Sequence, residues 1–319
     1  MKKIITLTSL AVSVGISSAQ EKGSVLDPFS RAIRPISSPT LFDLALPRTS
    51  ANLIYINQSL PSLINATLGS VPLNGDFNLY ALQLEYAINE RTSIIATKDG
   101  YIDFNPSNTL SSEDGFANIG AGIKRALIYN PEDQFILSGI LGVEIPTGNS
   151  DVFQGEGGGA LDIRLTTLKL YDRLQLATSA SFHIPFDDAD SVTGMINLHA
   201  SYEITPWFIP VAELSWFRSF DDGDGSTNFS SSQGGDLVPS VITFEGGDLI
   251  NFGASNGDEN ADIVNVAFGF RSRISDQMTL GVAYELPLTE SSETLLDKRV
   301  TASLTYIFLL AFWKGLKGT

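Results

Sequence analysis

The chain has 319 residues, and its 36 acidic and 20 basic side chains give a formal net charge of −16. This balance argues against nucleic acid as a partner, because binding to a polyphosphate backbone needs clustered Lys and Arg side chains. The sequence contains no cysteine, which excludes a disulfide framework and a lipid anchor attached to cysteine.

The first 19 residues have the pattern of a secretory signal peptide. Lys2 and Lys3 precede an apolar run over 4–16, and small residues then lead to Ala19. A retained helical anchor is the weaker alternative, because a helix needs about 20 apolar residues to cross a bilayer. We therefore expect residues 1–19 to be a signal peptide of an exported protein.

Residues 20–50 contain four prolines and have no sustained hydrophobic period. This pattern predicts a loosely structured N-terminal arm in the periplasm. The chain that follows, over 51–308, is predicted to form the folded domain, and residues 309–319 are predicted to be a C-terminal tail.

Within 51–308 the residues alternate between apolar and polar or small side chains. The stretch over 264–273 shows the pattern, with Phe268 and Phe270 on one predicted face and Arg271 and Arg273 on the other. Side chains alternate across a strand with a period of two, so such stretches predict β-strands with one apolar face. The strand over 92–103 is ambiguous, because it carries charges on both faces.

Short and long connections alternate between the predicted strands. The short ones are 89–91, 130–132, 171–173, 205–207 and 275–277, and the long ones are 58–75, 104–114, 146–158, 185–192, 220–260 and 288–294. They separate twelve predicted strands: 51–57, 76–88, 92–103, 115–129, 133–145, 159–170, 174–184, 193–204, 208–219, 261–274, 278–287 and 295–308. Short periplasmic turns and long outer loops are typical of outer-membrane barrels. Most of these strands exceed the ~5–6 residues usual in soluble sheets. The sequence therefore predicts an all-β fold, a closed antiparallel transmembrane β-barrel of about twelve strands.

The predicted charges lie on the face that also carries glycine and serine. A soluble β-sandwich, the rival fold, would carry its charges on the outer face, whereas a wet and crowded barrel interior accommodates charges beside small residues. The ionisable residues assigned to the lumen are Glu85, Lys124, Glu144, Asp162, Arg164, His183, His199, Glu203, Glu213, Arg271, Arg273, Glu285 and Arg299. We expect opposite charges among them to pair, which can plug the barrel. They can also create a transverse field that selects small polar solutes, and the two roles are compatible.

Turn centres give the register of two hairpins. They place Asp162 opposite His183, and His199 opposite Glu213, inside the barrel. The two histidines lie about 17 Å apart along the strands at ~3.3 Å per residue. One zinc ion cannot bridge that distance. The sequence therefore predicts no metal site and no cofactor, with both histidines in hydrogen-bond networks of the lumen.

A hydrolase is the enzymatic alternative. His199 with Glu213 and either Ser201 or Ser215 has the residue types of a nucleophile, a base and an orienting group. These residues would face the lumen rather than lipid, and no nucleophile motif surrounds either serine. The sequence therefore favours a protein that is not an enzyme.

The connection over 220–260 is acidic and has no Lys or Arg between Phe220 and Asn260. Loops fold into the lumen of many barrels. Gly234-Gly235 and Gly246-Gly247 give this loop conformational freedom. We expect it to be the gate or constriction.

Four segments resemble a group of outer-membrane β-barrel proteins described as transporter-like, or as the MetA-pathway group of phenol degradation. They are KDGY (98–101), DGFANIGAGIK (114–124), EIPTGNSDVFQGEG (144–157) and VAYELPLT (282–289). The similarity runs over about 50–308 and includes no catalytic residue. The resemblance implies a barrel with a transport role for small hydrophobic or aromatic compounds.

The sequence as a whole predicts a barrel in the bacterial outer membrane that acts as a passive channel or uptake conduit for small solutes. Its expected partners are outer-membrane lipid, periplasmic chaperones, the barrel-assembly machinery and a small-molecule solute. The alternatives are an outer-membrane lipid hydrolase and a non-conducting structural or adhesive barrel.

Overall fold

The structure is a computed structural model that describes residues 28–257 and 262–308. One antiparallel sheet closes on itself, because the first strand pairs with the last strand on one side and with β4 on the other. The strands are β1 (Ser50–Ser59), β4 (Gly75–Asn89), β5 (Thr92–Lys98), β6 (Tyr101–Pro106), β7 (Glu113–Phe116), β8 (Ile119–Asn130), β9 (Phe135–Ile145), β10 (Ala160–Tyr171), β11 (Leu174–Pro185), β12 (Val192–Tyr202), β13 (Ile209–Asp221), β14 (Asp262–Arg273), β15 (Met278–Pro287) and β16 (Lys298–Ile307).

The closed sheet makes twelve crossings. The sheet contains 14 strands, but two of its crossings are each made of two strands. β5 and β6 both pair with β4 and together form one crossing. β7 and β8 pair with β6 and β5 and together form the next crossing. The prediction of a closed antiparallel barrel of twelve strands is confirmed. No helix in the described part of the chain has both the length and the apolar character needed to cross a membrane.

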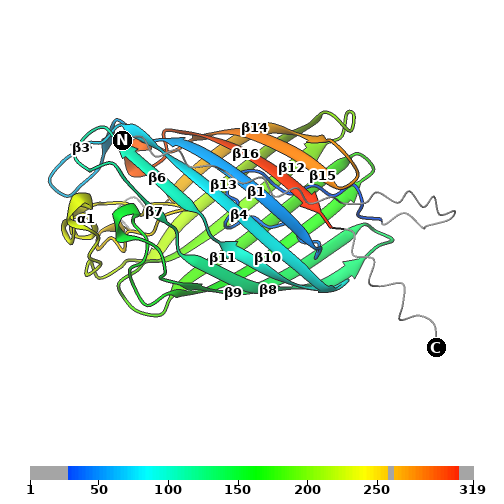
Figure 1. The fold of residues 1–319 in the computed structure, drawn as a ribbon, viewed down its shortest axis with the longest axis horizontal. Helices are drawn as coiled ribbons and strands as arrows, with labels where there is room; N and C mark the ends of the chain where they lie inside the picture. Colours follow the sequence, from blue (N-terminus) through cyan, green and yellow to red (C-terminus); the bar gives the residue numbers. More distant parts are fainter. Residues whose placement is uncertain (1–27, 258–261, 309–319) are drawn as a thin grey trace, which may run out of the picture.

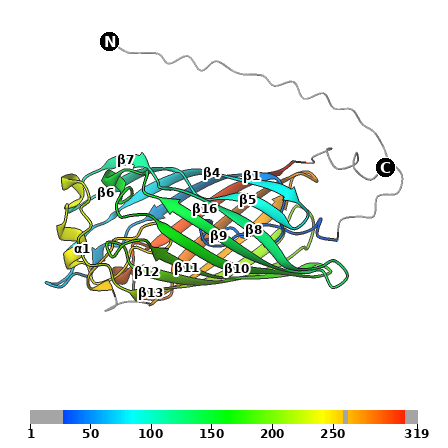
Figure 2. The ribbon, with the colours of Figure 1, turned by 90° about the horizontal axis from the view of Figure 1, so that it is seen from below.

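The two ends of the barrel differ. The long connections gather at one end, where Figure 1 shows the only α-helix among the described residues, α1 (Leu237–Val241). The same end carries the short elements β2 (Leu63–Ile64), β3 (Val71–Pro72), η1 (Ser150–Val152), η2 (Ser231–Gln233) and η4 (Ser291–Glu293). Tight turns join the strands at the other end (Figures 1 and 2). We call these the loop end and the turn end.

The apolar face of each strand is turned outward. Phe268 is 63 % exposed, whereas Arg271 on the other face of β14 is fully buried. Exposed Leu, Ile, Phe and Tyr side chains continue around the barrel on the other strands. This outer belt is what a hydrocarbon solvent requires, and it agrees with the fold and location of an outer-membrane barrel.

The register predicted from the turn centres is confirmed. Asp162 lies opposite His183 in the β10–β11 pair, and His199 lies opposite Glu213 in the β12–β13 pair. Short turns fix the register of antiparallel strands, so counting outward from the turn is sufficient in these hairpins.

The segment over 28–49 lies inside the barrel, which differs from the predicted periplasmic arm. Its apolar side chains Phe29, Ile36, Phe42 and Leu44 are almost completely buried against the inner faces of the strands. The prolines do prevent a strand, as expected, but the segment fills the lumen and does not remain in solvent. The predicted signal peptide and the predicted tail over 309–319 lie outside the described residues.

Candidate functional site

The N-terminal segment is held in the lumen by a chain of buried ion pairs. Asp43 of the segment pairs with Arg34 of the same segment (3.2 Å) and with Arg164 of β10. Glu85 of β4 contacts Arg34 (3.5 Å) and the ammonium of Lys124 on β8 (2.9 Å). The three strand charges Glu85, Lys124 and Arg164, which the sequence assigned to the lumen, therefore have partners on a segment that the sequence placed outside the barrel.

Lumen side chains also bind the backbone of this segment. Gln175 of β11 accepts a hydrogen bond from the Ile33 amide (2.9 Å) and donates one to the Ile33 carbonyl (2.8 Å). Glu213 of β13 accepts from the amides of Ile36 (3.0 Å) and Ser37 (2.6 Å). An unpaired amide buried in this lumen would cost free energy, so these side chains replace the partners that a sheet would supply.

His199, Glu213 and Ser201 form a hydrogen-bonded chain. Nδ1 of His199 lies 2.6 Å from a Glu213 oxygen, and Nε2 lies 2.9 Å from Oγ of Ser201. This is the order of a nucleophile, a base and an orienting carboxylate. However, Ser201 is only 4 % exposed, and Glu213 is occupied by the segment backbone. These three hydrogen-bonded side chains therefore hold the inserted N-terminal segment in place.

The turn end carries a separate group of charges. Glu203 after β12 pairs with Arg31 of the segment (3.1 Å) and with Arg273 of β14 (3.0 Å). Arg271 is the next inward residue of β14, farther from the tight turn than Arg273, and it donates a hydrogen bond to the carbonyl of Pro35 (2.9 Å). These arginines hold the segment by its backbone and close the periplasmic side of the lumen.

The acidic loop enters the barrel from the loop end. Asp248 of this loop pairs with Arg299 of β16 (2.6 Å), which also contacts Glu285 of β15 (3.4 Å). Glu245 accepts hydrogen bonds from the Ser191 hydroxyl and from three backbone amides of the loop itself. Burial raises the pKa of Glu245 to about 7. The described part of the predicted gate, up to residue 257, is therefore a folded plug.

The interior under this loop is apolar. Ile56 of β1, Phe77 of β4 and Phe104 of β6 point inward and pack against loop residues that include Phe244 and Phe252. Phe153 links them through edge-on ring contacts with Phe104 at 5.5 Å and Phe252 at 5.2 Å. Buried apolar side chains such as Leu170 and Val211 also occur near the turn end, and the loop end carries charges on β9, β10 and β11, so this apolar region is confined to the side of the barrel formed by β1, β4 and β6.

The barrel wall is interrupted beside this apolar region. β4 pairs with β5 through residues 85–89 and with β6 through 75–80, and the Leu82 amide between them is bound by the Asp99 carboxylate (3.2 Å). A mostly apolar groove of about 490 Å³ opens here on the membrane side, lined by Leu53, Leu82, Tyr101, Phe116, Ala117 and Asp99. A small cavity on the lumen side is also lined by Asp99 and Ala117. The two hollows thus lie on either side of Asp99 and Ala117.

The break explains the ambiguous strand. Residues predicted as one strand over 92–103 form β5 and β6, with Gly100 between them at φ +137°. A Cβ at Gly100 would also lie 2.7 Å from Leu79, so this position favours glycine on two grounds. The charge of Lys98 points to the lumen and that of Asp99 to the wall.

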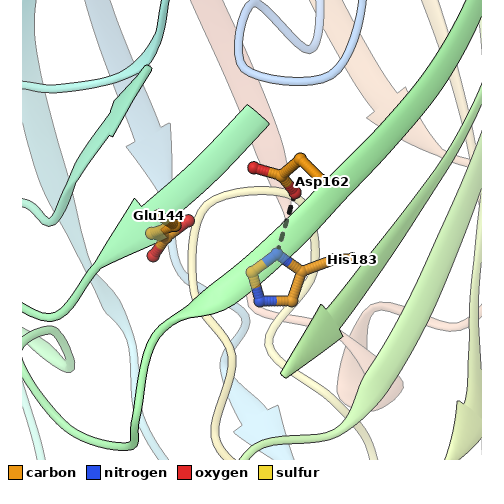
Figure 3. Close-up of side chains that lie close together, drawn as sticks. All are labelled: Glu144, Asp162 and His183. Carbon is orange, nitrogen blue, oxygen red and sulfur yellow. Dashed lines mark hydrogen bonds and ion pairs between the residues drawn. The ribbon is translucent and has the colours of Figure 1, made fainter. Parts of the chain in front are cut away.

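A final cluster lies at the loop end of β9, β10 and β11. Nδ1 of His183 is 3.0 Å from a carboxylate oxygen of Asp162 (Figure 3). Glu144 lies beside them and receives the Lys98 ammonium at 2.7 Å. The structure thus places the ionisable residues that the sequence assigned to the lumen in four groups. One group contacts the N-terminal segment, one lies at the turn end, one lies under the acidic loop, and one forms this cluster.

Sequence reasoning missed the partners of these groups. Asp43, Arg34 and Arg31 lie in the segment expected to be an arm, and Asp248 lies in the loop. A usable signal was the apolar character of 29–46, because a chain that remains in the periplasm has no reason to carry Phe and Leu beside isolated charges.

Comparison with known proteins agrees with this class of fold. No protein-family model and no curated relative matches the sequence. The fold is similar to the crystal structure of an outer membrane channel from Pseudomonas putida F1, with a TM-score of 0.54 and 13 % sequence identity over 82 % of this chain and 96 % of that one. Two porins, NanC and KdgM, give TM-scores of 0.46 and 0.43 at 7 % and 9 % identity, over 82 % of this chain and 100 % and 99 % of theirs. At these identities the likeness concerns the fold, which is that of an outer-membrane β-barrel.

Proposed function

We propose that this barrel is a gated uptake conduit for small hydrophobic or aromatic compounds. The observation that carries the proposal is the apolar inner face at the loop end, formed by residues such as Ile56, Phe77 and Phe104. A water-filled lumen is lined by polar side chains, as in porins. An apolar lining stabilises a solute that leaves water, and it disfavours hydrated ions and sugars.

The arrangement of the two inserted segments supports a route that does not run straight through the barrel. The N-terminal segment and its ion pairs fill the middle and the turn end of the lumen, so a solute cannot pass along the barrel axis without displacing them. The groove in the wall lies at the height of the apolar region and is lined by Leu82 and Phe116 on the membrane side. A solute that reaches the apolar region therefore has a shorter exit into the membrane than into the periplasm. The loop over 222–257 is the part that must move to admit it.

Two further observations are consistent with the proposed solute class. The structural neighbour from Pseudomonas putida F1 is described as an outer membrane channel. The resemblance to the MetA-pathway group of phenol degradation implies small aromatic compounds as solutes. Membership of that group remains a prediction.

A lipid hydrolase is the second candidate, favoured by the hydrogen-bonded chain of Ser201, His199 and Glu213. Ser201 lies in the lumen near the turn end, next to a cavity of only about 10 Å³. A lipid ester cannot approach Ser201 unless the N-terminal segment leaves. We therefore assign no catalytic role to this chain.

The test is uptake in a bacterial outer membrane that lacks its general porins. The protein is expected to raise uptake of a radiolabelled aromatic hydrocarbon and to leave uptake of a hydrophilic sugar unchanged. Leu82→Trp enlarges an exposed side chain that lines the groove and is expected to lower hydrocarbon uptake several-fold. Ile196→Trp, on the membrane-facing side of β12, is the matched control and should have no effect.

Two results would overturn the proposal. Uptake of the sugar without uptake of the hydrocarbon would identify a hydrophilic channel. Equal hydrocarbon uptake by Leu82→Trp and by the wild type, both shown to be folded by heat-modifiable gel mobility, would exclude the exit through the wall.

A further inference from the structure

Three potential metal ligands converge at the loop end of the lumen. Glu144, Asp162 and His183 come from the adjacent strands β9, β10 and β11, and one ligand atom from each lies within 4.8 Å of the other two. The strand pairing fixes this convergence, because Asp162 lies opposite His183 and Ala160 lies opposite Glu144. Figure 3 shows the imidazole hydrogen-bonded to Asp162, with Glu144 beside this pair.

The separations suit a single ion. Nδ1 of His183 and the facing oxygen of Asp162 are 3.0 Å apart. Bonds of about 2.0–2.2 Å to one ion place neighbouring ligand atoms roughly 3–3.5 Å apart. Glu144 receives both of its hydrogen bonds, from Lys98 and Asn118, on Oε1, so its Oε2 is outside them. A small rotation of Glu144 completes a three-ligand set.

The surroundings supply room and charge. A cavity of about 40 Å³ is lined by all three residues, by Lys98 and by loop residues 247–251. This is enough for an ion with a water ligand, since one water needs ~10–15 Å³ of such volume. Asp190 of the neighbouring loop borders an adjoining cavity with Glu144 and His183. With neutral histidine, the three carboxylates and Lys98 sum to −2, a charge that one divalent cation neutralises.

We propose that Glu144, Asp162 and His183 bind a divalent transition-metal ion of the Zn²⁺ class, and that the Lys98 ammonium on Glu144 opposes this ion by its positive charge. An imidazole nitrogen with two carboxylates selects such ions, whereas Ca²⁺ and Mg²⁺ prefer oxygen ligands alone. The bound ion links three strands directly beneath loop residues 247–251. Its occupancy therefore stabilises the closed loop end by mass action.

The experiment uses the full protein folded in detergent micelles. Zn²⁺ binding is measured by calorimetry, and Co²⁺ binding by the visible absorption that a nitrogen and oxygen ligand set produces. One equivalent of each ion is expected to bind. His183→Gln and Asp162→Asn should each weaken binding at least ~10-fold and change the Co²⁺ spectrum, because loss of even an outer partner commonly costs 10–100-fold.

Two controls separate a metal site from a structural salt bridge. Lys98→Gln removes the competing cation and is expected to tighten Zn²⁺ binding, which a purely structural ion pair would not do. Glu90→Gln removes one exposed carboxylate at the turn end and should leave binding unchanged. The proposal is overturned if the wild type takes up no Zn²⁺ or if His183→Gln binds Zn²⁺ as tightly as the wild type does. It is also overturned if the wild type and His183→Gln bind Ca²⁺ equally well.

Discussion

Asp43 of the N-terminal segment and Arg164 of strand β10 form an ion pair in the middle of the lumen, with both side chains almost completely buried. The pair joins a segment without regular structure to the wall of the barrel. Arg34 approaches the same carboxylate at 3.2 Å, so one aspartate pairs with two buried guanidinium groups. The closed state of the barrel therefore depends strongly on this carboxylate.

Asp43→Asn is expected to destabilise the inserted segment. Removing one partner of a buried ion pair leaves the other charge uncompensated, at a cost of about 3–5 kcal/mol. The loss should appear as a lower unfolding temperature in detergent and as a higher ion conductance in planar bilayers, since the segment then leaves the lumen more often.

Asp172→Asn is the matched control for that substitution. Asp172 also contacts an arginine of the segment, Arg31 at 3.4 Å, but its side chain is 82 % exposed. Exposed pairs contribute only about 0–1 kcal/mol. Equal effects of the two substitutions would contradict the lumen position of Asp43.

A disulfide can test the path of the segment directly. Oγ of Ser38 and Oγ of Ser215 on β13 are 3.3 Å apart, and the natural chain has no cysteine to interfere. We expect the double variant Ser38→Cys and Ser215→Cys to crosslink under mild oxidation and to keep its conductance at the closed level. Mass spectrometry of the proteolysed protein detects the linked peptides. Each single variant should give no such link, and no link in the oxidised double variant would place the segment elsewhere.

The plug formed by the acidic loop should loosen as pH rises. Burial raises the pKa of Glu245 from its ordinary 4.5 to about 7 in the folded loop. Between these values the folded state binds more protons than the open state, so stability is full below about pH 4.5 and is lost as pH rises through 7. Asp190, whose pKa burial raises to about 6, contributes in the same direction.

Limited proteolysis by chymotrypsin measures this opening, because the buried Phe244 and Phe252 become accessible only when the loop leaves the lumen. Cleavage should be faster at pH 8 than at pH 5.5 after correction for enzyme activity on a free peptide. Glu245→Gln keeps the size of the side chain and cannot ionise, so it should remove most of the pH dependence. A cleavage rate in the wild type that does not change with pH would refute this assignment.

The sequence was sufficient for the barrel because the relevant patterns are local. Alternation with period two decides which face each side chain joins, and short turns fix which residues oppose each other. Asp162 therefore meets His183, and His199 meets Glu213, as predicted. Glu144 was not expected beside His183, because the two residues lie on β9 and β11, on either side of β10. The register between β9 and β10 is set by a long connection and cannot be counted from a tight turn.

The contents of the lumen could not be predicted in the same way. The segment over 28–49 and the loop around Asp248 have no period, so their positions follow from the shape of the cavity and from the buried charges that need partners. Arg164, Lys124 and Arg299 were assigned to the lumen without identified partners on these inserted segments. Pairing among the strand charges alone was expected, whereas Arg164 and Arg299 instead pair with Asp43 and Asp248 of the inserted segments.

Phe268→Arg tests the outward face of the barrel. Phe268 lies in the outer belt of β14, 63 % exposed, and its neighbour Ala267 faces the lumen. An arginine on the lipid face costs about 2–4 kcal/mol near the middle of the bilayer, and less toward its surfaces. We expect this loss in the free energy of unfolding measured by urea titration in phospholipid vesicles. Asp276→Arg, an exposed residue of the tight turn after β14, introduces the same side chain outside the bilayer and should cost less than about 0.5 kcal/mol. If both substitutions were equally mild, water rather than hydrocarbon would surround Phe268.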